Sequence, residues 1–213
     1  MYAAIKAEIL AGAYPAGVHL DAKELSTRLG TSTTPIRAAL YRLAGERLLE
    51  IRSNDGFYLP SFSESSLSAL YRWIRSLLIQ AVTPPPADRM TMDPRIAADI
   101  GDREPVDMVE ATDWLFLRIG ALSGEIEVHW ALLNANERLR PIRRLESRCI
   151  GDQEGELRAL SVGLLRDDRA RLEEAIHVYF RRRERVISDL VLLVTHAGDR
   201  RPAEEQGPDS EAG

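Results

Sequence analysis

Four hydroxyl-bearing side chains stand in a row at Thr31, Ser32, Thr33 and Thr34, and Arg37 follows three residues later. Hydroxyl groups and the amides of a helix start bind phosphate oxygens. An arginine guanidinium matches the two acceptors that guanine presents in the major groove. These residue types at this spacing therefore predict contact with nucleic acid rather than bond-breaking chemistry.

The flanking sequence predicts the two helices that position these side chains. A first helix is expected over Ala22–Leu29, with Asp21 as its N-cap and Gly30 at its end. A second helix opens at Pro35. Its core stripe has helical spacing: Ile36, Leu40 and Leu43. This is the layout of a helix-turn-helix, whose second helix lies in the major groove.

A two-stranded wing is predicted directly after the second helix. Residues 48–51 and 57–59 are short apolar segments typical of strands, and Asn54-Asp55-Gly56 between them is a strong hairpin signal. A helix over Tyr2–Leu10 and a short extended segment at Val18–Leu20 precede the motif. Residues 1–61 are therefore expected to form a winged helix-turn-helix domain.

The groove-facing side of the second helix supplies the candidate DNA contacts. Arg37 is expected to contact a base, whereas the other arginines and Tyr41 are expected to position the DNA backbone and the wing to reach the minor groove. An alternative is that Arg37 and Arg42 are solvated charges, paired with Glu46. The complete candidate set is Thr31, Ser32, Thr33, Thr34, Arg37, Tyr41, Arg42, Arg47, Arg52, Asn54 and Gly56.

The composition is that of an ordinary globular protein with a modest acidic excess. The chain has 213 residues, of which 29% are charged, and a net charge of −5. The charge is uneven, because residues 1–60 carry a small net positive charge, and DNA binding depends on the local charge that faces phosphate. Cys149 is the only cysteine, and neither a secretory signal nor a membrane-spanning run is expected. A cytoplasmic location with no membrane partner is therefore predicted.

The rest of the chain shows only helical patterns, so the expected fold class is mainly α. Residues 62–197 are predicted to form an all-α helical bundle that ends in one long helix. The buried stripe of that helix is Leu172, Ile176, Tyr179, Ile187, Leu190 and Val194. Residues 198–213 lack apolar periodicity and are predicted to be a disordered tail.

The first 60 residues resemble the winged helix-turn-helix of the GntR family of bacterial transcription regulators. Two positions depart from the family pattern: Thr33 stands where the family usually has arginine, and Ala38 where it usually has glutamate. The residues that carry the resemblance are Ile9, Gly12, Tyr14-Pro15-Ala16-Gly17, Leu20, Leu25, Leu29-Gly30, Ser32, Thr34-Pro35, Ile36-Arg37, Ala39-Leu40, Arg42-Leu43, Glu46, Leu48 and Gly56. The resemblance implies a bacterial, nucleoid-associated protein whose partner is a double-stranded DNA operator.

Residues 62 to 196 resemble, more weakly, the ligand domain of the FadR-type branch, called FCD. Many members hold a divalent metal with one aspartate and three histidines. The aspartate position corresponds to Asp113, and the histidine positions to Leu117, Leu157 and Tyr179. Leucine has no lone pair to donate, so the resemblance implies a metal-free member without a cofactor. The other matching residues are Arg75, Phe116, Ser123-Gly124, Glu156, Leu160, Leu164 and Asp168.

The same resemblance suggests an effector site in the bundle. Arg75 is expected to grip an effector carboxylate, with Asp113, Leu117, Leu157 and Tyr179 around a largely apolar cavity. The alternatives are that Arg75 is partly exposed or paired with Asp113, and that leucine side chains simply fill the cavity.

A homodimer is expected, because helix-turn-helix proteins read two half-sites related by a two-fold axis. An apolar stripe on the first bundle helix is either the dimer interface or monomer core: Leu67, Leu70, Ile74 and Leu77. The sequence thus predicts a DNA-binding transcription regulator, a repressor controlled by a small effector. The alternative is a constitutive DNA-binding dimer with a filled pocket. No enzyme is expected, since no catalytic triad, phosphate loop or metal constellation is found.

Overall fold

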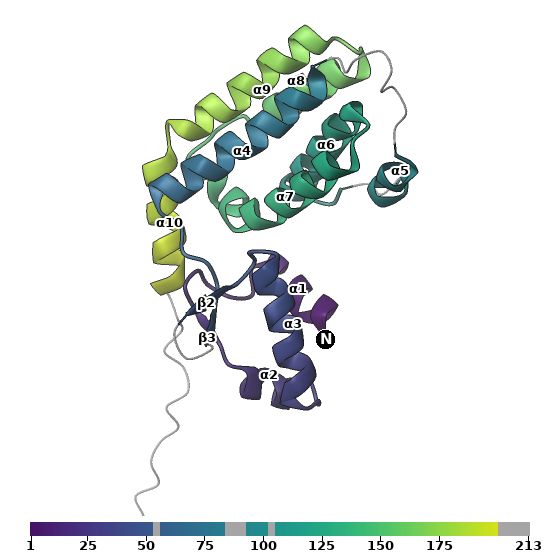
Figure 1. Ribbon diagram of the computed structural model, residues 1–213. Coiled ribbons are helices and arrows are strands. Elements are labelled where there is room, and N and C mark those ends of the chain that lie inside the picture. Colours follow the sequence, from purple (N-terminus) through teal and green to yellow (C-terminus); the bar gives the residue numbers. More distant parts are fainter. Residues whose placement is uncertain (53–55, 84–92, 102–104, 200–213) are drawn as a thin grey trace, which may run out of the picture.

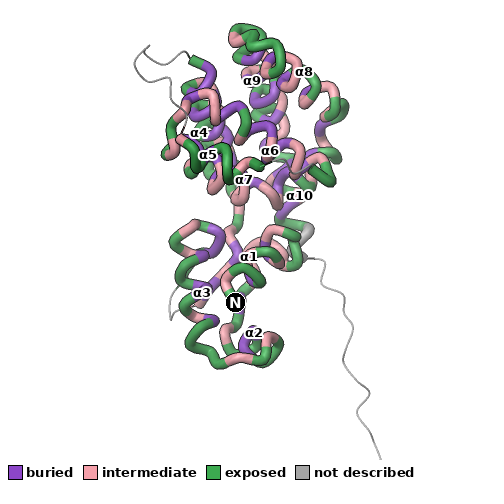
Figure 2. Tube along the Cα trace, turned by 90° about the vertical axis from the view of Figure 1, so that its right-hand side faces the viewer, coloured by how far each residue is buried: buried purple, intermediate pink, exposed green. Residues whose placement is uncertain are grey.

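A computed structural model of the chain describes residues 1–52, 56–83, 93–101 and 105–199. Two parts are stacked end to end: an N-terminal module of residues 1–60 and a larger helical bundle that begins at α4 (Figure 1). Buried residues gather inside each part, and they form two separate hydrophobic clusters (Figure 2). The expected mainly helical fold class is confirmed, whereas the domain boundaries at 61 and 197 stay predictions.

The N-terminal module packs three helices against a small sheet. Its helices are α1 Tyr2–Ala11, α2 Ala22–Arg28 and α3 Thr33–Gly45, and its strands are β1 His19–Leu20, β2 Glu50–Arg52 and β3 Gly56–Tyr58. The predicted stripe on α3 is its core, since Ile36, Leu40 and Leu43 are completely buried. α3 begins at Thr33, two residues before the expected Pro35.

The ends of α2 follow from the residues predicted to cap it. The Asp21 carboxylate accepts hydrogen bonds from the backbone N–H groups of Lys23 and Glu24, which satisfies two amides of the first turn. At the other end, Gly30 adopts a left-handed φ of 63°. The Thr31 amide then reaches back to the Ser26 carbonyl at 3.0 Å, which is the Schellman arrangement that glycine favours.

The wing is part of a three-stranded antiparallel sheet with the strand order β1-β3-β2. The expected hairpin of β2 and β3 is present, and the segment predicted only as extended joins it as β1, pairing Leu20 with Phe57. Leu48 and Leu49 precede β2 rather than forming part of it, and both are buried. The predicted hairpin residues Asn54 and Asp55 lie outside the described residues.

The bundle is built around α4 and α7. Its helices are α4 Glu64–Val82, α5 Pro94–Ile100, α6 Met108–Gly120, a 3-10 turn Ala121–Ser123, α7 Ile126–Glu146, α8 Gln153–Leu165, α9 Arg169–Glu184 and α10 Ile187–Asp199. A capping box of Ser63 and Ser66 begins α4. No helix among the described ranges is long and apolar enough to cross a membrane.

The prediction of one long C-terminal helix is wrong, because the chain turns at Arg185 and Val186 between α9 and α10. α9 packs mainly on α8 and α4, whereas α10 packs on α7 and α4. One straight helix would not reach both surfaces. The buried stripe itself was predicted correctly: Leu172, Ile176, Tyr179, Ile187, Leu190 and Val194.

The apolar stripe on α4 belongs to the core of the monomer. Leu67 and Ile74 are completely buried, and Leu70 and Leu77 are each 5% exposed. The alternative in which these residues form the dimer interface is therefore wrong. The predicted disordered tail lies almost entirely outside the described residues, since α10 continues to Asp199.

Candidate nucleic-acid interface

The outer face of α3 gathers most of the predicted DNA contacts on one exposed surface. Thr33, Thr34 and Ala38 are exposed, and Tyr41 is 42% exposed. The N-terminal end of α3 lies beside α2, at the end of the molecule farthest from the bundle (Figure 1). A helix that shows its first turns in this way is able to enter a groove without collision with the bundle.

The start of α3 leaves its polar groups directed outward. Ser32 is the N-cap residue, but its side chain makes no capping hydrogen bond. The preceding Thr31 is half-buried in the turn between α2 and α3. The first amides of a helix lack partners within the helix, and they carry the positive end of the helix dipole. Phosphate binding at this end is therefore favoured by the backbone as well as by the hydroxyl groups.

Arg37 and Tyr41 form the middle of this surface. The Arg37 guanidinium lies 6.0 Å from the centre of the Tyr41 ring. The Tyr41 ring in turn meets the buried ring of Phe57 edge-on, with 4.9 Å between ring centres. Tyr41 thus ties the exposed face of α3 to β3, so the recognition helix and the wing are held in one fixed relation.

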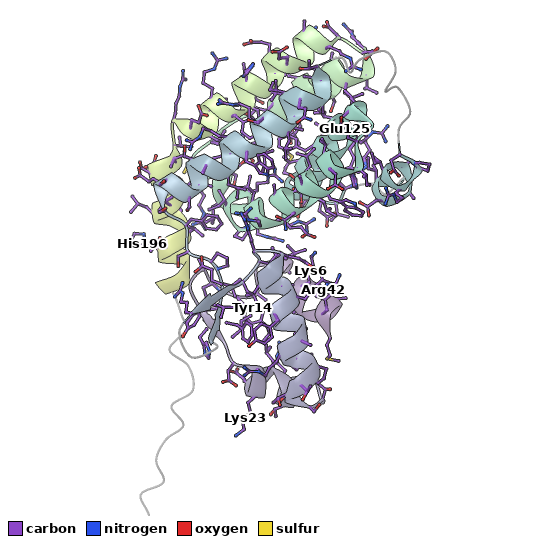
Figure 3. All side chains as sticks on the ribbon, in the orientation of Figure 1. Lys6, Tyr14, Lys23, Arg42, Glu125 and His196 are labelled. Carbon is purple, nitrogen blue, oxygen red and sulfur yellow. The ribbon has the colours of Figure 1, made fainter. Side chains whose placement is uncertain are left out.

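Arg42 and Arg52 make ion pairs within the N-terminal module. Arg42 lies in the N-terminal module (Figure 3). Its guanidinium stacks 3.8 Å from the centre of the Tyr2 ring, and its Nε lies 3.3 Å from the Glu46 carboxylate. Arg52 pairs with Glu50 at 3.1 Å, next to the Gly56 end of β3. The predicted alternative of an intrahelical pair with Glu46 thus describes Arg42 in this structure.

Arg47 does not belong with the other candidates. It follows the C-terminal end of α3, close to the bundle, where it helps to line a cavity with Arg138 of α7. The exposed first turns of α3 are at the opposite end of the helix. Arg47 therefore lies apart from the other candidates, and its contact with DNA stays a prediction.

Of the predicted effector residues, Leu157 and Tyr179 line one small cavity, whereas Arg75 and Asp113 are held in separate ion pairs. Arg75 lies at the surface between α4 and α9, where its guanidinium pairs with Glu184 at 2.9 Å. Asp113 is buried on α6 and is paired instead with Arg143 and with Arg140, the latter at 2.8 Å. The predicted alternative of a partly exposed Arg75 thus describes this structure, whereas the alternative pairing with Asp113 is wrong.

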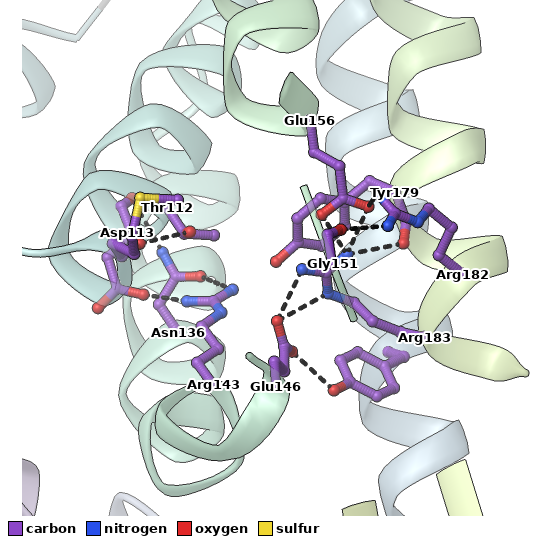
Figure 4. A network of polar contacts seen from close by, with 12 residues as sticks. Thr112, Asp113, Asn136, Arg143, Glu146, Gly151, Glu156, Tyr179, Arg182 and Arg183 are labelled. Carbon is purple, nitrogen blue, oxygen red and sulfur yellow. Dashed lines mark hydrogen bonds and ion pairs between the residues drawn. The ribbon is translucent and has the colours of Figure 1, made fainter. Parts of the chain in front are cut away.

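A network of buried ion pairs occupies the centre of the bundle. Arg183 is 2% exposed, and its guanidinium contacts Glu146 at 2.7 Å and Glu156 at 3.1 Å (Figure 4). The Tyr71 hydroxyl donates to the same Glu146 carboxylate at 2.9 Å. Burial raises the pKa of Glu156. The network joins α4, α7, α8 and α9, far apart along the chain.

A second buried arginine joins α6 to α7. Arg143 contacts the Asp113 carboxylate and donates to the Asn136 side-chain oxygen at 3.0 Å, while the Asn136 amide donates to the Asp113 backbone carbonyl at 3.2 Å (Figure 4). Buried charges are tolerated when they are paired and hydrogen-bonded in this way. The sequence reasoning missed these arginines, although Arg143 and Arg183 lie four residues after the buried Leu139 and Tyr179 and so continue apolar stripes.

The cavity expected beside Leu157 and Tyr179 is filled by these arginines. What remains there is about 10 Å³, lined by Arg143 and Arg183, roughly the space of one water molecule. Leu117 does not line it. Burial raises the pKa of Tyr179 to about 12, so this hydroxyl stays protonated at neutral pH. Neither the predicted apolar pocket nor filling by leucine describes this region, because charged side chains take up the space.

No group of three or more potential metal ligands comes together among the described residues. His129 is completely buried, with its Nε2 2.7 Å from the Asp99 carboxylate, and His196 contacts the Leu192 carbonyl. The His129 imidazole is thus paired with one carboxylate, and the His196 imidazole with a backbone carbonyl of its own helix.

Comparison with known proteins agrees with this geometry. Residues 1–59 match the gntR family of bacterial regulatory proteins. The Nta operon transcriptional regulator of Aminobacter aminovorans is 27% identical over 139 residues, which cover 61% of this chain and 65% of that relative. The chain thus spans slightly less than two thirds of the relative's length.

Solved structures share the fold at low sequence identity. A putative transcriptional regulator GntR from Rhodococcus sp. RHA1 has a TM-score of 0.65 at 15% identity, covering 92% of this chain and 96% of that one. McbR/YncC of E. coli has a TM-score of 0.58 at 17% identity, covering 88% and 95%. These similarities extend the shared fold to the helical bundle.

The exposed α3, the turn that precedes it and the three-stranded wing define a winged helix-turn-helix, a class of DNA-binding domain. The family model of the gntR bacterial regulatory proteins matches this same module, residues 1–59.

Proposed function

We propose that the protein is a sequence-specific DNA-binding transcription regulator that acts as a repressor. The observation that carries this proposal is the exposed outer face of α3, where Thr33, Thr34, Arg37 and Tyr41 stand over a completely apolar inner face. Hydroxyls and the helix start suit phosphate, and the Arg37 guanidinium suits guanine. Thr31, Ser32, Arg42, Arg52 and the wing around Gly56 flank this face as contacts to the backbone.

A homodimer is part of this proposal. One module presents a single recognition helix, and a pair related by a two-fold axis reads two half-sites about one helical turn apart. The apolar stripe of α4 is already used in the monomer core, so the contact must use other residues. Trp73 on α4 is 50% exposed and is the large apolar side chain on that helix available to a second copy. A dimer seated on an operator excludes other proteins from the same DNA, which is the basis for repression.

The filled centre of the bundle favours a second candidate function, that of a DNA-binding dimer without an effector in the bundle. With Arg143 and Arg183 occupying the space, the residual volume of about 10 Å³ does not admit a small-molecule effector. The candidate is a DNA-binding dimer whose bundle centre holds no effector. Control by a ligand then requires a site elsewhere in the chain.

Selection of bound duplexes from a random pool, followed by fluorescence anisotropy on the selected sequence, tests the function. Arg37→Ala is expected to weaken binding by about 1–3 kcal/mol and to relax the preference at one base pair in each half-site. Arg181→Ala is the matched control, because Arg181 is an exposed arginine on α9. Failure to enrich any duplex at modest ionic strength would contradict the proposal, and equal losses in both variants would remove Arg37 from its role.

A further inference from the structure

A cavity of about 280 Å³ lies where the N-terminal module meets the bundle. Both parts of the molecule and the segment that links them contribute to its wall. The apolar residues of its wall include Leu48, Leu49, Leu59, Phe62, Leu70 and Pro141. Pockets that bind small molecules are mostly apolar and measure ~300–1,000 Å³. This junction cavity is at the small end of that range, so it suits a compact ligand.

Two arginines from opposite sides also line the junction cavity. Arg47 comes from the turn after α3, and Arg138 comes from α7. Within the described part of the chain neither guanidinium has an ion pair or a hydrogen bond. Burial and the neighbouring Arg47 charge lower the pKa of Arg138. Two cations thus face one partly buried space without an anion between them.

The acidic residues nearby are already engaged. Glu137 lines the cavity, but its carboxylate lies 2.8 Å from the Lys6 ammonium. Glu50 also lines it and pairs with Arg52 at 3.1 Å. The protein therefore does not use these carboxylates to neutralise Arg47 and Arg138. Arg47 and Arg138 thus line the cavity without a carboxylate partner among the described residues, although two carboxylates line the same cavity.

The backbone at Arg47 is left-handed, a conformation that glycine adopts most readily and that is unfavourable for arginine. Arg47 has a φ of 57°, and its amide bonds to Ala44 while the Leu48 amide bonds to Leu43, which closes α3 in the same Schellman arrangement that ends α2 at Gly30. α2 uses glycine at this position and α3 uses arginine. Strain of this kind concentrates at functional positions. The Arg47 side chain thus stands where the backbone alone would favour glycine.

We propose that the junction cavity binds a small amphipathic carboxylate, with its anionic head between Arg47 and Arg138 and its apolar body against Leu48, Leu49 and Leu70. Arginine binds carboxylates with two parallel hydrogen bonds, and an anion here removes the repulsion between the two guanidinium groups. The apolar wall selects a hydrocarbon body over a sugar or a nucleotide.

The position of the site gives it a consequence for DNA binding, and this step rests on the proposed function. Arg47 is joined directly to the end of α3, whereas Arg138 belongs to the bundle. A bound carboxylate holds the two together and so fixes the orientation of α3 relative to the bundle. Ligand binding and DNA binding are coupled whenever the two orientations of the module differ in affinity for DNA.

Isothermal titration calorimetry of the full chain with 3-phenylpropionate and octanoate tests the site. The corresponding amides are the uncharged control ligands. The acids are expected to bind in the ~millimolar range or tighter, as small ligands do. Binding is expected to fall at least ~10-fold in Arg138→Gln, and the amides are expected to bind weakly to every variant. Arg158→Gln removes the same charge from the exposed face of α8 and should bind the acids like the natural chain. Acids that bind no better than their amides, or equally well to Arg138→Gln, would overturn the proposal.

Thermal unfolding without ligand gives a second, independent measurement. Arg138→Gln relieves like-charge repulsion and Arg47→Gly relieves the left-handed strain as well, so each is expected to raise Tm by ~2 °C or more. Arg158→Gln should leave Tm unchanged. A lower Tm in Arg138→Gln would show that this arginine holds the fold together, which contradicts a ligand role.

Failure of the cavity and failure of the proposed function give different results. If the chain binds the acids but no duplex, the cavity stands and the DNA proposal fails. If the chain binds a selected duplex but not the acids, the cavity proposal fails alone. When both proposals hold, 3-phenylpropionate shifts the duplex affinity of the natural chain and of Arg158→Gln, but not that of Arg138→Gln. Arg37→Ala then loses duplex affinity and still binds the acid.

Discussion

The N-terminal module and the bundle bury different kinds of side chain. The core of the module is aliphatic and aromatic, and its described ionic groups lie at the surface or in partly exposed pairs. The bundle buries two arginines and three carboxylates: Asp113, Arg143, Glu146, Glu156 and Arg183. The core of the module is thus apolar, whereas the core of the bundle also contains charges that must find their partners.

This difference determines how the stability of each part responds to substitution. Apolar contacts are non-directional, so a core of that kind tolerates some repacking. A buried ion pair adds little net stability, but the loss of one partner strands a charge away from water. The bundle is therefore expected to be sensitive at a few charged positions, and the module at its large apolar ones.

The largest effect is expected from Arg183→Ala. This change leaves the Glu146 and Glu156 carboxylates buried without their shared cation, and breaking a buried pair in this way costs about 3–5 kcal/mol. Urea unfolding followed by tryptophan fluorescence measures it, because Trp73, Trp114 and Trp130 all lie in the bundle. Arg181→Ala, at an exposed position on the same helix, should change the free energy of unfolding by less than about 0.5 kcal/mol. Equal effects would mean that the network does not hold the bundle.

A somewhat smaller effect is expected from Leu40→Ala in the module. Leu40 is completely buried, and removing its side chain leaves an apolar cavity that costs about 2–5 kcal/mol. The module holds none of the tryptophans. The change should therefore lower the midpoint seen by far-ultraviolet circular dichroism and weaken DNA binding, with little shift in tryptophan fluorescence. A large shift in fluorescence would show instead that the two hydrophobic clusters unfold as one unit.

The sequence was sufficient for the module because its signals are local. Asp21 caps the amides of its own helix, Gly30 supplies the left-handed turn, and Ile36 to Leu43 repeat with the period of a helix. Each of these effects acts within a few residues. The third strand was missed because β1 is only two residues long and depends on its pairing with β3.

The bundle site was not predictable to the same degree. That Arg183 occupies a buried position can be inferred from its place four residues after Tyr179. Its partners cannot, since Glu146 and Glu156 lie 37 and 27 residues away and reach it through the packing of separate helices. The partner of Arg75 was missed for the same reason, because Glu184 lies far along the chain on α9.

A modest effect on DNA binding is expected from Arg42→Ala. Its guanidinium is held by Glu46 and by the Tyr2 ring, so a contact with phosphate competes with interactions that it already makes. We expect a loss of about 0.5–1 kcal/mol that is uniform across DNA sequences, with the slope of log affinity against log salt reduced by about 1. Anisotropy titrations at several salt concentrations measure both quantities. A change in base preference would assign Arg42 to a base contact instead.

The smallest effect is expected from a surface pair of the module. The Arg28 guanidinium holds the Glu8 carboxylate at 2.6 Å, and this hydrogen bond lowers the pKa of Glu8 below its ordinary value of 4.5. A lowered pKa in the folded state means that the unfolded chain binds the proton more readily, so this contribution is present above pH ~4.5 and is lost as the pH falls through the lowered pKa.

Because the pair is partly exposed, Glu8→Gln should cost less than about 1 kcal/mol at pH 7. The difference from the natural chain should shrink at pH ~3, where the Glu8 carboxylate is largely protonated in the unfolded chain and increasingly so in the folded one. Far-ultraviolet circular dichroism is the measurement, because it includes the helices of the module, whereas all three tryptophans lie in the bundle. A difference that persists unchanged at low pH would show that Glu8 acts through packing rather than charge. The stability of the module would then not depend on the charge of this surface pair.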